Sequence, residues 1–132
     1  MSRLFSTMAA AVAIGCSAGA ASAETIEVAV KRSTATAIGS RLNYFPETCT
    51  SAATADISVA RQGQNGTVTL SRQLLRMPAD ALCPGVEFKA LVYIYRPRPG
   101  FVGRDRVVIR VPTGPFEYAG GYVDKVYEIT VQ

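Results

Sequence analysis

The stretch YRPRPGFVGRDRVVIRV, residues 95–111, decides the fold more than any other part of the chain. Its first half holds two prolines and two glycines, which interrupt strands and form turns. In its second half apolar residues alternate with polar ones, so that Val107, Ile109 and Val111 fall on one face of a strand. The other face carries Arg104, Arg106, Val108 and Arg110. The stretch therefore predicts a turn that leads into a half-buried strand over residues 104–111.

The same period of two recurs in most of the chain. It appears in residues 25–31, 55–61, 67–70, 86–95 and 123–131, each bounded by turn signals such as Asn65-Gly66 and Pro84-Gly85. Residues 71–82 permit one helical turn, and residues 33–54 are expected to hold one short strand and a loop. No alternation of strand and helix patterns is present. The sequence predicts an all-β domain, an antiparallel sandwich of about seven strands.

The N-terminus has the order of an export signal. A basic residue, Arg3, precedes an apolar run over residues 4–14, and small residues end at Ala23. This order predicts a signal peptide, residues 1–23, cleaved before Glu24. The run is shorter than the roughly 20 residues that cross a bilayer, so we expect no transmembrane span after cleavage.

Cleavage leaves residues 24–132 as a single domain in the periplasm or outside the cell. Loss of Arg3 leaves 14 − 1 = 13 basic and 10 acidic residues, a net charge of +3. A second route stays open, because Ala13-Ile14-Gly15-Cys16 resembles a lipoprotein signal in which Cys16 would carry the lipid. That route would anchor the domain to a membrane.

Two cysteines remain in the domain, Cys49 and Cys83. In a small exported domain such a pair predicts one structural disulfide. They are separated by 34 residues, and closing that loop stabilises the fold by about 3.8 kcal/mol on the chain-entropy model.

The catalytic motifs that can be read from sequence are absent. The chain contains no histidine, no nucleophile elbow, no phosphate-binding loop and no metal-ligand cluster. We therefore expect a non-enzymatic protein without cofactor or metal. A nucleic-acid binder would need more positive charge and a recognisable binding module, and this sequence shows neither.

Three segments resemble a known family: ISVARQGQNGTVTL (57–70), YRPRPGFVGRDRVVIRV (95–111) and DKVYEITV (124–131). They look like the bacterial Ig-like, cadherin-like repeats of surface and exported proteins, over about residues 55–132. The resemblance implies an Ig-like sandwich. Arg104 and Arg106 stand where that family usually has Thr and Ser, and the family's Asp-rich calcium segment has no counterpart.

The turn motif itself carries structural expectations. Gly100 and Gly103 are expected to adopt backbone conformations that other residues avoid, and Phe101 to plug the end of the core. Asp105 is expected to cap backbone amides or to pair with an arginine, rather than to bind metal.

One strand face is the candidate binding surface. If residues 86–95 form a hairpin with residues 104–111, two outward tyrosines lie beside the arginines, which gives the set Tyr93, Tyr95, Arg104, Arg106 and Arg110. Arginine stacked on tyrosine suits an anionic ligand, although the same pattern describes an ordinary solvated face. The leading hypothesis is an exported binding module for an anionic glycan or another anionic envelope component. The alternative is a structural accessory subunit that pairs with a larger envelope protein through a β edge.

Overall fold

A computed structural model describes residues 23–52, 56–112 and 121–132. The predicted signal peptide, which includes Cys16, lies outside the described residues apart from its last residue, Ala23. The described residues form nine strands and no helix, which confirms the all-β prediction and corrects the expected number of about seven. The strands are β1 (Glu24–Val30), β2 (Thr36–Arg41), β3 (Tyr44–Phe45), β4 (Thr50–Ser51), β5 (Ser58–Arg61), β6 (Gly66–Arg76), β7 (Glu87–Pro97), β8 (Gly103–Pro112) and β9 (Tyr122–Val131). None of these residues belongs to a helix that could span a membrane.

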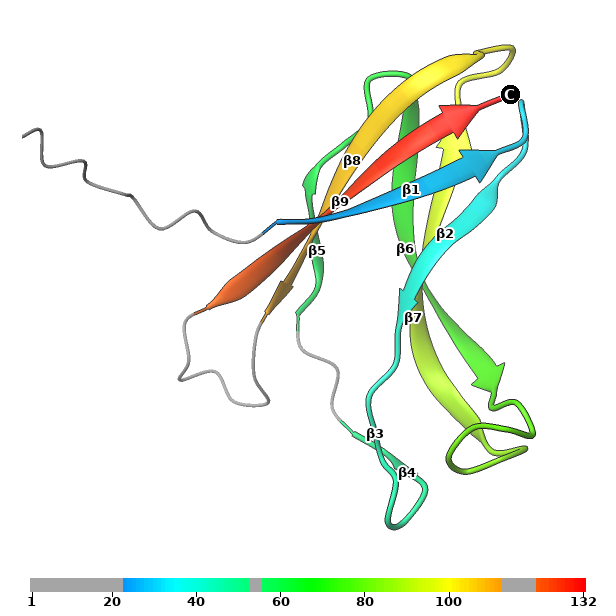
Figure 1. Cartoon of the computed structure of the whole chain (residues 1–132), viewed down its shortest axis with the longest axis vertical. Helices are drawn as coiled ribbons and strands as arrows, with labels where there is room; N and C mark the ends of the chain where they lie inside the picture. Colours follow the sequence, from blue (N-terminus) through cyan, green and yellow to red (C-terminus); the bar gives the residue numbers. More distant parts are fainter. Residues whose placement is uncertain (1–22, 53–55, 113–120) are drawn as a thin grey trace, which may run out of the picture.

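The strands form three sheets (Figure 1). One sheet has the order β1-β9-β8-β5, the second has the order β2-β7-β6, and β3 pairs only with β4. Every pair is antiparallel except β1 with β9, which corrects the prediction of purely antiparallel sheets. The chain between β1 and β9 contains all the other strands, so it is more than long enough for the crossover connection that a parallel pair requires.

The two larger sheets share one hydrophobic core. Its buried members come from both sheets: Val30, Ile38, Val68, Tyr93, Tyr95, Val107, Ile109, Val111, Tyr127, Ile129 and Val131. The inward face predicted for residues 104–111 is confirmed, since Val107, Ile109 and Val111 are all buried. Phe101 packs against this core, as the turn motif indicated.

Residues 86–95 and 104–111 do not form the hairpin on which the candidate Arg/Tyr face depended. β7 lies between β2 and β6, whereas β8 lies between β9 and β5 in the other sheet. The turn that joins β7 to β8 therefore carries the chain from one sheet to the other. This crossing decides which side chains of β7 face the core.

β7 uses its two faces in different halves. Its C-terminal half buries Tyr93 and Tyr95 between the two sheets, while its N-terminal half buries Phe88 and Ala90 on the opposite face. The ring of Tyr44 in β3 stacks on Phe88, with centroids 4.8 Å apart. The strand therefore contributes to the main core and to a second, smaller contact with the β3–β4 hairpin.

Two segments differ from the sequence prediction. Ser71–Arg76 continues β6, because this strand pairs with β7 without a break from Gly66 to Arg76; the expected helical turn is absent. The segment 33–54 holds β2, β3 and β4 instead of one strand. The predicted disulfide Cys49–Cys83 is present and joins the β3–β4 hairpin to the turn between β6 and β7.

Candidate functional site

Asp105 is the centre of a hydrogen-bonded lock at the start of β8. Its Oδ1 accepts hydrogen bonds from the backbone N–H groups of Gln64 and Arg106, both at 2.9 Å. Its Oδ2 accepts one from the Asn65 N–H at 3.1 Å and one from the Tyr95 hydroxyl at 2.7 Å. The residue is buried, with 6% exposed. The expectation that Asp105 caps backbone amides is confirmed.

The glycines of the motif serve this lock and the turn beside it. A Cβ at Gly66 would lie 2.5 Å from the ring and hydroxyl of Tyr95, so no larger residue fits there. Gly100 and Gly103 have φ values of 76° and 141°, which confirms the expected backbone conformations. The residues that carry the family resemblance are therefore mainly structural, because they fix the turn at 63–66 against β7 and β8.

The proposed Arg/Tyr strand face does not form. Tyr93 and Tyr95 are 1% and 0% exposed and belong to the core, because β7 lies in the other sheet and turns these side chains inward. The Tyr93 ring packs edge-on against Tyr127, with centroids 6.2 Å apart. Burial raises the pKa of Tyr95, and its hydrogen bond to Asp105 raises that pKa further. Neither tyrosine is available to stack on a ligand.

Two of the three arginines of that face are paired with acids of β9. Arg106 donates to Glu128, with its Nε 2.6 Å from a carboxylate oxygen. Arg110 holds Asp124 through two hydrogen bonds of 2.9 and 3.1 Å and also lies over the ring of Tyr122, at 3.9 Å from the centroid.

The second pair shifts the acid–base equilibria of both partners. The hydrogen bonds from Arg110 lower the pKa of Asp124, and the same hydrogen bonds raise the pKa of Arg110. A sequence signal for these pairs exists, since the acids at 124 and 128 have the same spacing as the arginines at 106 and 110.

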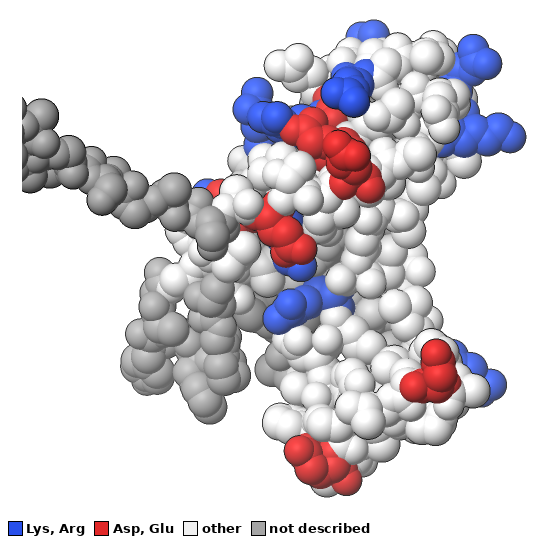
Figure 2. All heavy atoms as spheres, in the orientation of Figure 1, with Lys and Arg blue, Asp and Glu red and all other residues white. Residues whose placement is uncertain are grey.

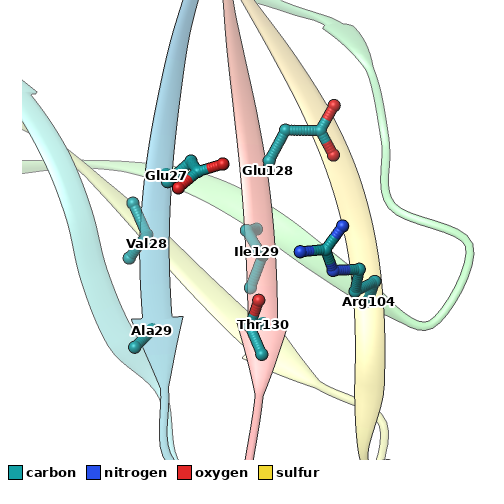
Figure 3. Close-up of a pocket in the computed structure, with 7 residues that line it drawn as sticks. All are labelled: Glu27, Val28, Ala29, Arg104, Glu128, Ile129 and Thr130. Atoms are coloured by element: carbon teal, nitrogen blue, oxygen red, sulfur yellow. The ribbon is translucent and has the colours of Figure 1, made fainter.

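Arg104 makes no ion pair within the described residues. It lines a shallow hollow of about 290 Å³ on the outer face of β1, β9 and β8 (Figure 3). Glu27 and Glu128 line the same hollow, and in Figure 3 Glu27 lies on the far side of β9 from Arg104, while Glu128 extends from β9 toward β8. Because both signs of charge line the hollow, it does not attract an anion as the predicted arginine face would have.

A second surface is more uniformly basic, and we call it the basic end. It consists of the turn residues 31–34, 63–67 and 96–102, which contain Lys31, Arg32, Arg96 and Arg98 and no Asp or Glu. In Figure 2, Lys and Arg side chains surround the upper end of the molecule, where Figure 1 shows the turns that join β1 to β2 and β7 to β8.

Hydrogen bonds donated by backbone N–H groups hold the three turns of the basic end together. The Gly100 N–H donates to the Ser33 Oγ at 3.1 Å, and the Arg98 N–H donates to the Asn65 carbonyl at 2.7 Å. Turns that are more than 30 residues apart in sequence are thus fixed side by side. The sequence analysis missed this surface because it considered the faces of single strands. The available signal was that Lys31-Arg32 stands at the end of a predicted strand and Arg96-Pro97-Arg98 stands directly before the turn signal Pro99-Gly100.

The described residues contain no group of three or more His, Cys, Asp or Glu side chains that could hold a metal ion. Comparison of the chain with protein-family models, with curated proteins and with solved structures finds no match. Function must therefore be argued from the surface of the molecule.

Proposed function

We propose that this chain is an exported, non-enzymatic binding module with an Ig-like sandwich fold, and that its basic end contacts an anionic component of the cell envelope. The observation that carries the proposal is that four basic side chains gather at this end without any acidic residue in its three turns. The basic end takes the place of the Arg/Tyr strand face as the contact surface. An anionic glycan is the partner class that fits it.

Long-range electrostatics supports this surface over the outer face of β8. The arginines at 106 and 110 are neutralised by the β9 acids, whereas the basic side chains at 31, 32, 96 and 98 make no ion pair within the described residues. Unpaired charges within one Debye length, about 8 Å at physiological ionic strength, add their potentials. Binding to a polyanion should therefore weaken as salt rises.

The test is binding of the exported chain to dextran sulfate, with uncharged dextran as the blank. A variant with Lys31, Arg32, Arg96 and Arg98 changed to Gln should bind at least about tenfold more weakly, since four charge contacts are lost. The matched control changes four other exposed basic residues to Gln: Arg61, Arg72, Arg76 and Lys89. If both variants lose affinity equally, only net charge matters and the basic end is not a site.

Export is tested by the mass of the protein recovered from its native compartment. The proposal expects Glu24 as the first residue, because the segment before it has the order of a cleavable signal. A lipid on Cys16 at the N-terminus would instead place the domain on a membrane surface.

A second candidate function is a structural accessory subunit, and the free edge of β6 favours it. The side chain of Gln62 bonds both the N–H and the C=O of Val68, at 2.8 and 2.9 Å, so these backbone groups point away from β7. Hydrogen-bonding direction alternates along an antiparallel strand, so the backbone groups of Leu70, Arg72 and Leu74 point the same way. β6 is an edge strand, and an added strand could pair there.

A proline at position 74 tests this second function. Leu74→Pro removes an outward N–H without removing a hydrogen bond to β7, so the domain should fold while the added strand loses one bond. Leu74→Ala is the control for the lost side chain, which is 63% exposed. The accessory function requires one envelope protein to co-purify stoichiometrically with the wild type and the alanine variant but not with the proline variant.

A further inference from the structure

The basic end contains a hollow of about 370 Å³ between two of its turns. Residues 63–67 form one side and residues 96–99 the other. The lock at Asp105 fixes the first side, because the backbone N–H groups of Gln64 and Asn65 are bound to its carboxylate. The hydrogen bond from the Arg98 N–H to the Asn65 carbonyl fixes the second side against the first. Hydrogen bonds therefore tie the two sides of the hollow to each other and to β8.

Two arginines line the hollow, and each is held by a neighbour that carries no charge. The Arg96 guanidinium donates from Nη1 to the Thr69 hydroxyl at 2.7 Å. The Arg98 guanidinium lies 5.7 Å from the centroid of the Phe101 ring. Neither arginine forms an ion pair with a described residue, so no paired acid offsets either positive charge, and most of their N–H donors remain for a ligand.

We infer that this hollow is a subsite for a single tetrahedral oxyanion, the phosphate or sulfate group of an ester. Two guanidinium groups offer two forks of parallel N–H donors. A carboxylate has two oxygens and is satisfied by one fork, whereas phosphate and sulfate have enough oxygens to accept both. The amide side chains of Gln64 and Asn65 add polar donors that tolerate an anion. The inference rests on the proposed function, because the hollow lies within the basic end.

The experiment is an NMR titration of the isotope-labelled chain with sodium phosphate, sodium sulfate and sodium acetate at constant ionic strength. Phosphate or sulfate should produce saturable shifts at the amides of residues 63–67 and at those of Arg96 and Arg98, and acetate should bind more weakly. Raising the pH from about 6 to 8 makes phosphate a dianion, so phosphate binding should strengthen while sulfate binding stays constant. At the higher pH both anions carry two charges, so their relative affinities there separate a phosphate site from a sulfate site.

Lysine variants distinguish recognition of the anion by the planar guanidinium fork from attraction by positive charge alone. Arg96→Lys and Arg98→Lys keep the charge but lose the planar fork, so the affinity for the oxyanion should fall at least about fivefold. Arg61→Lys, outside the basic end, is the matched control and should bind as the wild type does. Unchanged affinity in both hollow variants would overturn the subsite, as would equal shifts with acetate.

The two proposals can fail separately. Dextran sulfate binding through the basic end without saturable binding of phosphate or sulfate would leave the proposed function standing and reject the subsite. Saturable oxyanion binding in the hollow without dextran sulfate binding would support the subsite and reject a polyanionic partner.

Discussion

Asp105→Ala should be among the most destabilising single changes in the domain that leave the hydrophobic core intact. The substitution removes the acceptor for the N–H groups of Gln64 and Asn65 and for the Tyr95 hydroxyl. The turn at 63–66 then loses its link to β8. The change is local, because within the described residues the Asp105 side chain makes no other hydrogen bond except with the N–H of its own neighbour, Arg106.

The magnitude follows from the number of bonds. Three hydrogen bonds at about 1 kcal/mol each give about 3 kcal/mol. The Tyr95 hydroxyl, on a residue that is 0% exposed, is left without its acceptor, which costs a further 1 to 2 kcal/mol, roughly. The free energy of unfolding should therefore fall by about 4 to 5 kcal/mol.

The assay is urea unfolding followed by circular dichroism and by tyrosine fluorescence, since the chain has no tryptophan. Tyr95→Phe alone should cost about 1 to 2 kcal/mol, and in the Asp105→Ala background it should recover about 1 to 2 kcal/mol, because it removes the buried hydroxyl that has lost its acceptor. Asp124→Ala is the matched control, an acid that also binds through two hydrogen bonds but at the surface, and its effect should be much smaller.

A loss below about 1 kcal/mol for Asp105→Ala, with an unchanged urea dependence, would show that the lock contributes little and that the turn is held by other contacts. Additive effects of the Asp105 and Tyr95 variants would refute the pairing between the two side chains.

Three further expectations concern the same fold. Replacing Cys49 and Cys83 by Ser should lower the free energy of unfolding by about 3.8 kcal/mol, given a separation of 34 residues, and non-reducing peptide mapping of the wild type should find the bridge. Gly66→Ala places a Cβ 2.5 Å from the buried Tyr95 ring and should lower the free energy of unfolding by about 1 to 3 kcal/mol in urea, and an unchanged value would contradict the close packing at this position. Burial raises the pKa of Tyr127 to about 12, so the folded state keeps a proton that an unfolded tyrosine loses near pH 10. The free energy of unfolding should therefore be constant below about pH 10 and fall between about pH 10 and 12. A flat profile over that window would contradict the buried position of Tyr127.

Local patterns determined much of this protein. The alternation in residues 104–111 correctly identified the buried face of β8, because beyond Asp105 one face is apolar and the other is largely charged. The two cysteines of the domain predicted the disulfide, and the motif around Asp105 predicted its capping role. Each of these depends on chemistry within a few residues or, for the disulfide, on the fact that the predicted domain contains only two cysteines.

Only the tertiary structure decided which face of β7 packs against the other sheet. This strand carries apolar residues on both faces, Phe88 and Ala90 on one and Tyr93 and Tyr95 on the other. Its period of two separates the faces but does not say which one meets the second sheet. The position of β7 between β2 and β6 decides that, and it turned two expected ligand contacts into core residues.

The surface charges depend on the tertiary structure for the same reason. Pairing of β8 with β9 places acids opposite Arg106 and Arg110, and contacts among three distant turns place Lys31 and Arg32 near Arg98. The sequence determined which residues alternate and which turns are basic, since these are local properties. Whether a charge is neutralised or joins others is a property of residues far apart in the chain, and only the packing of the sheets brings those residues together.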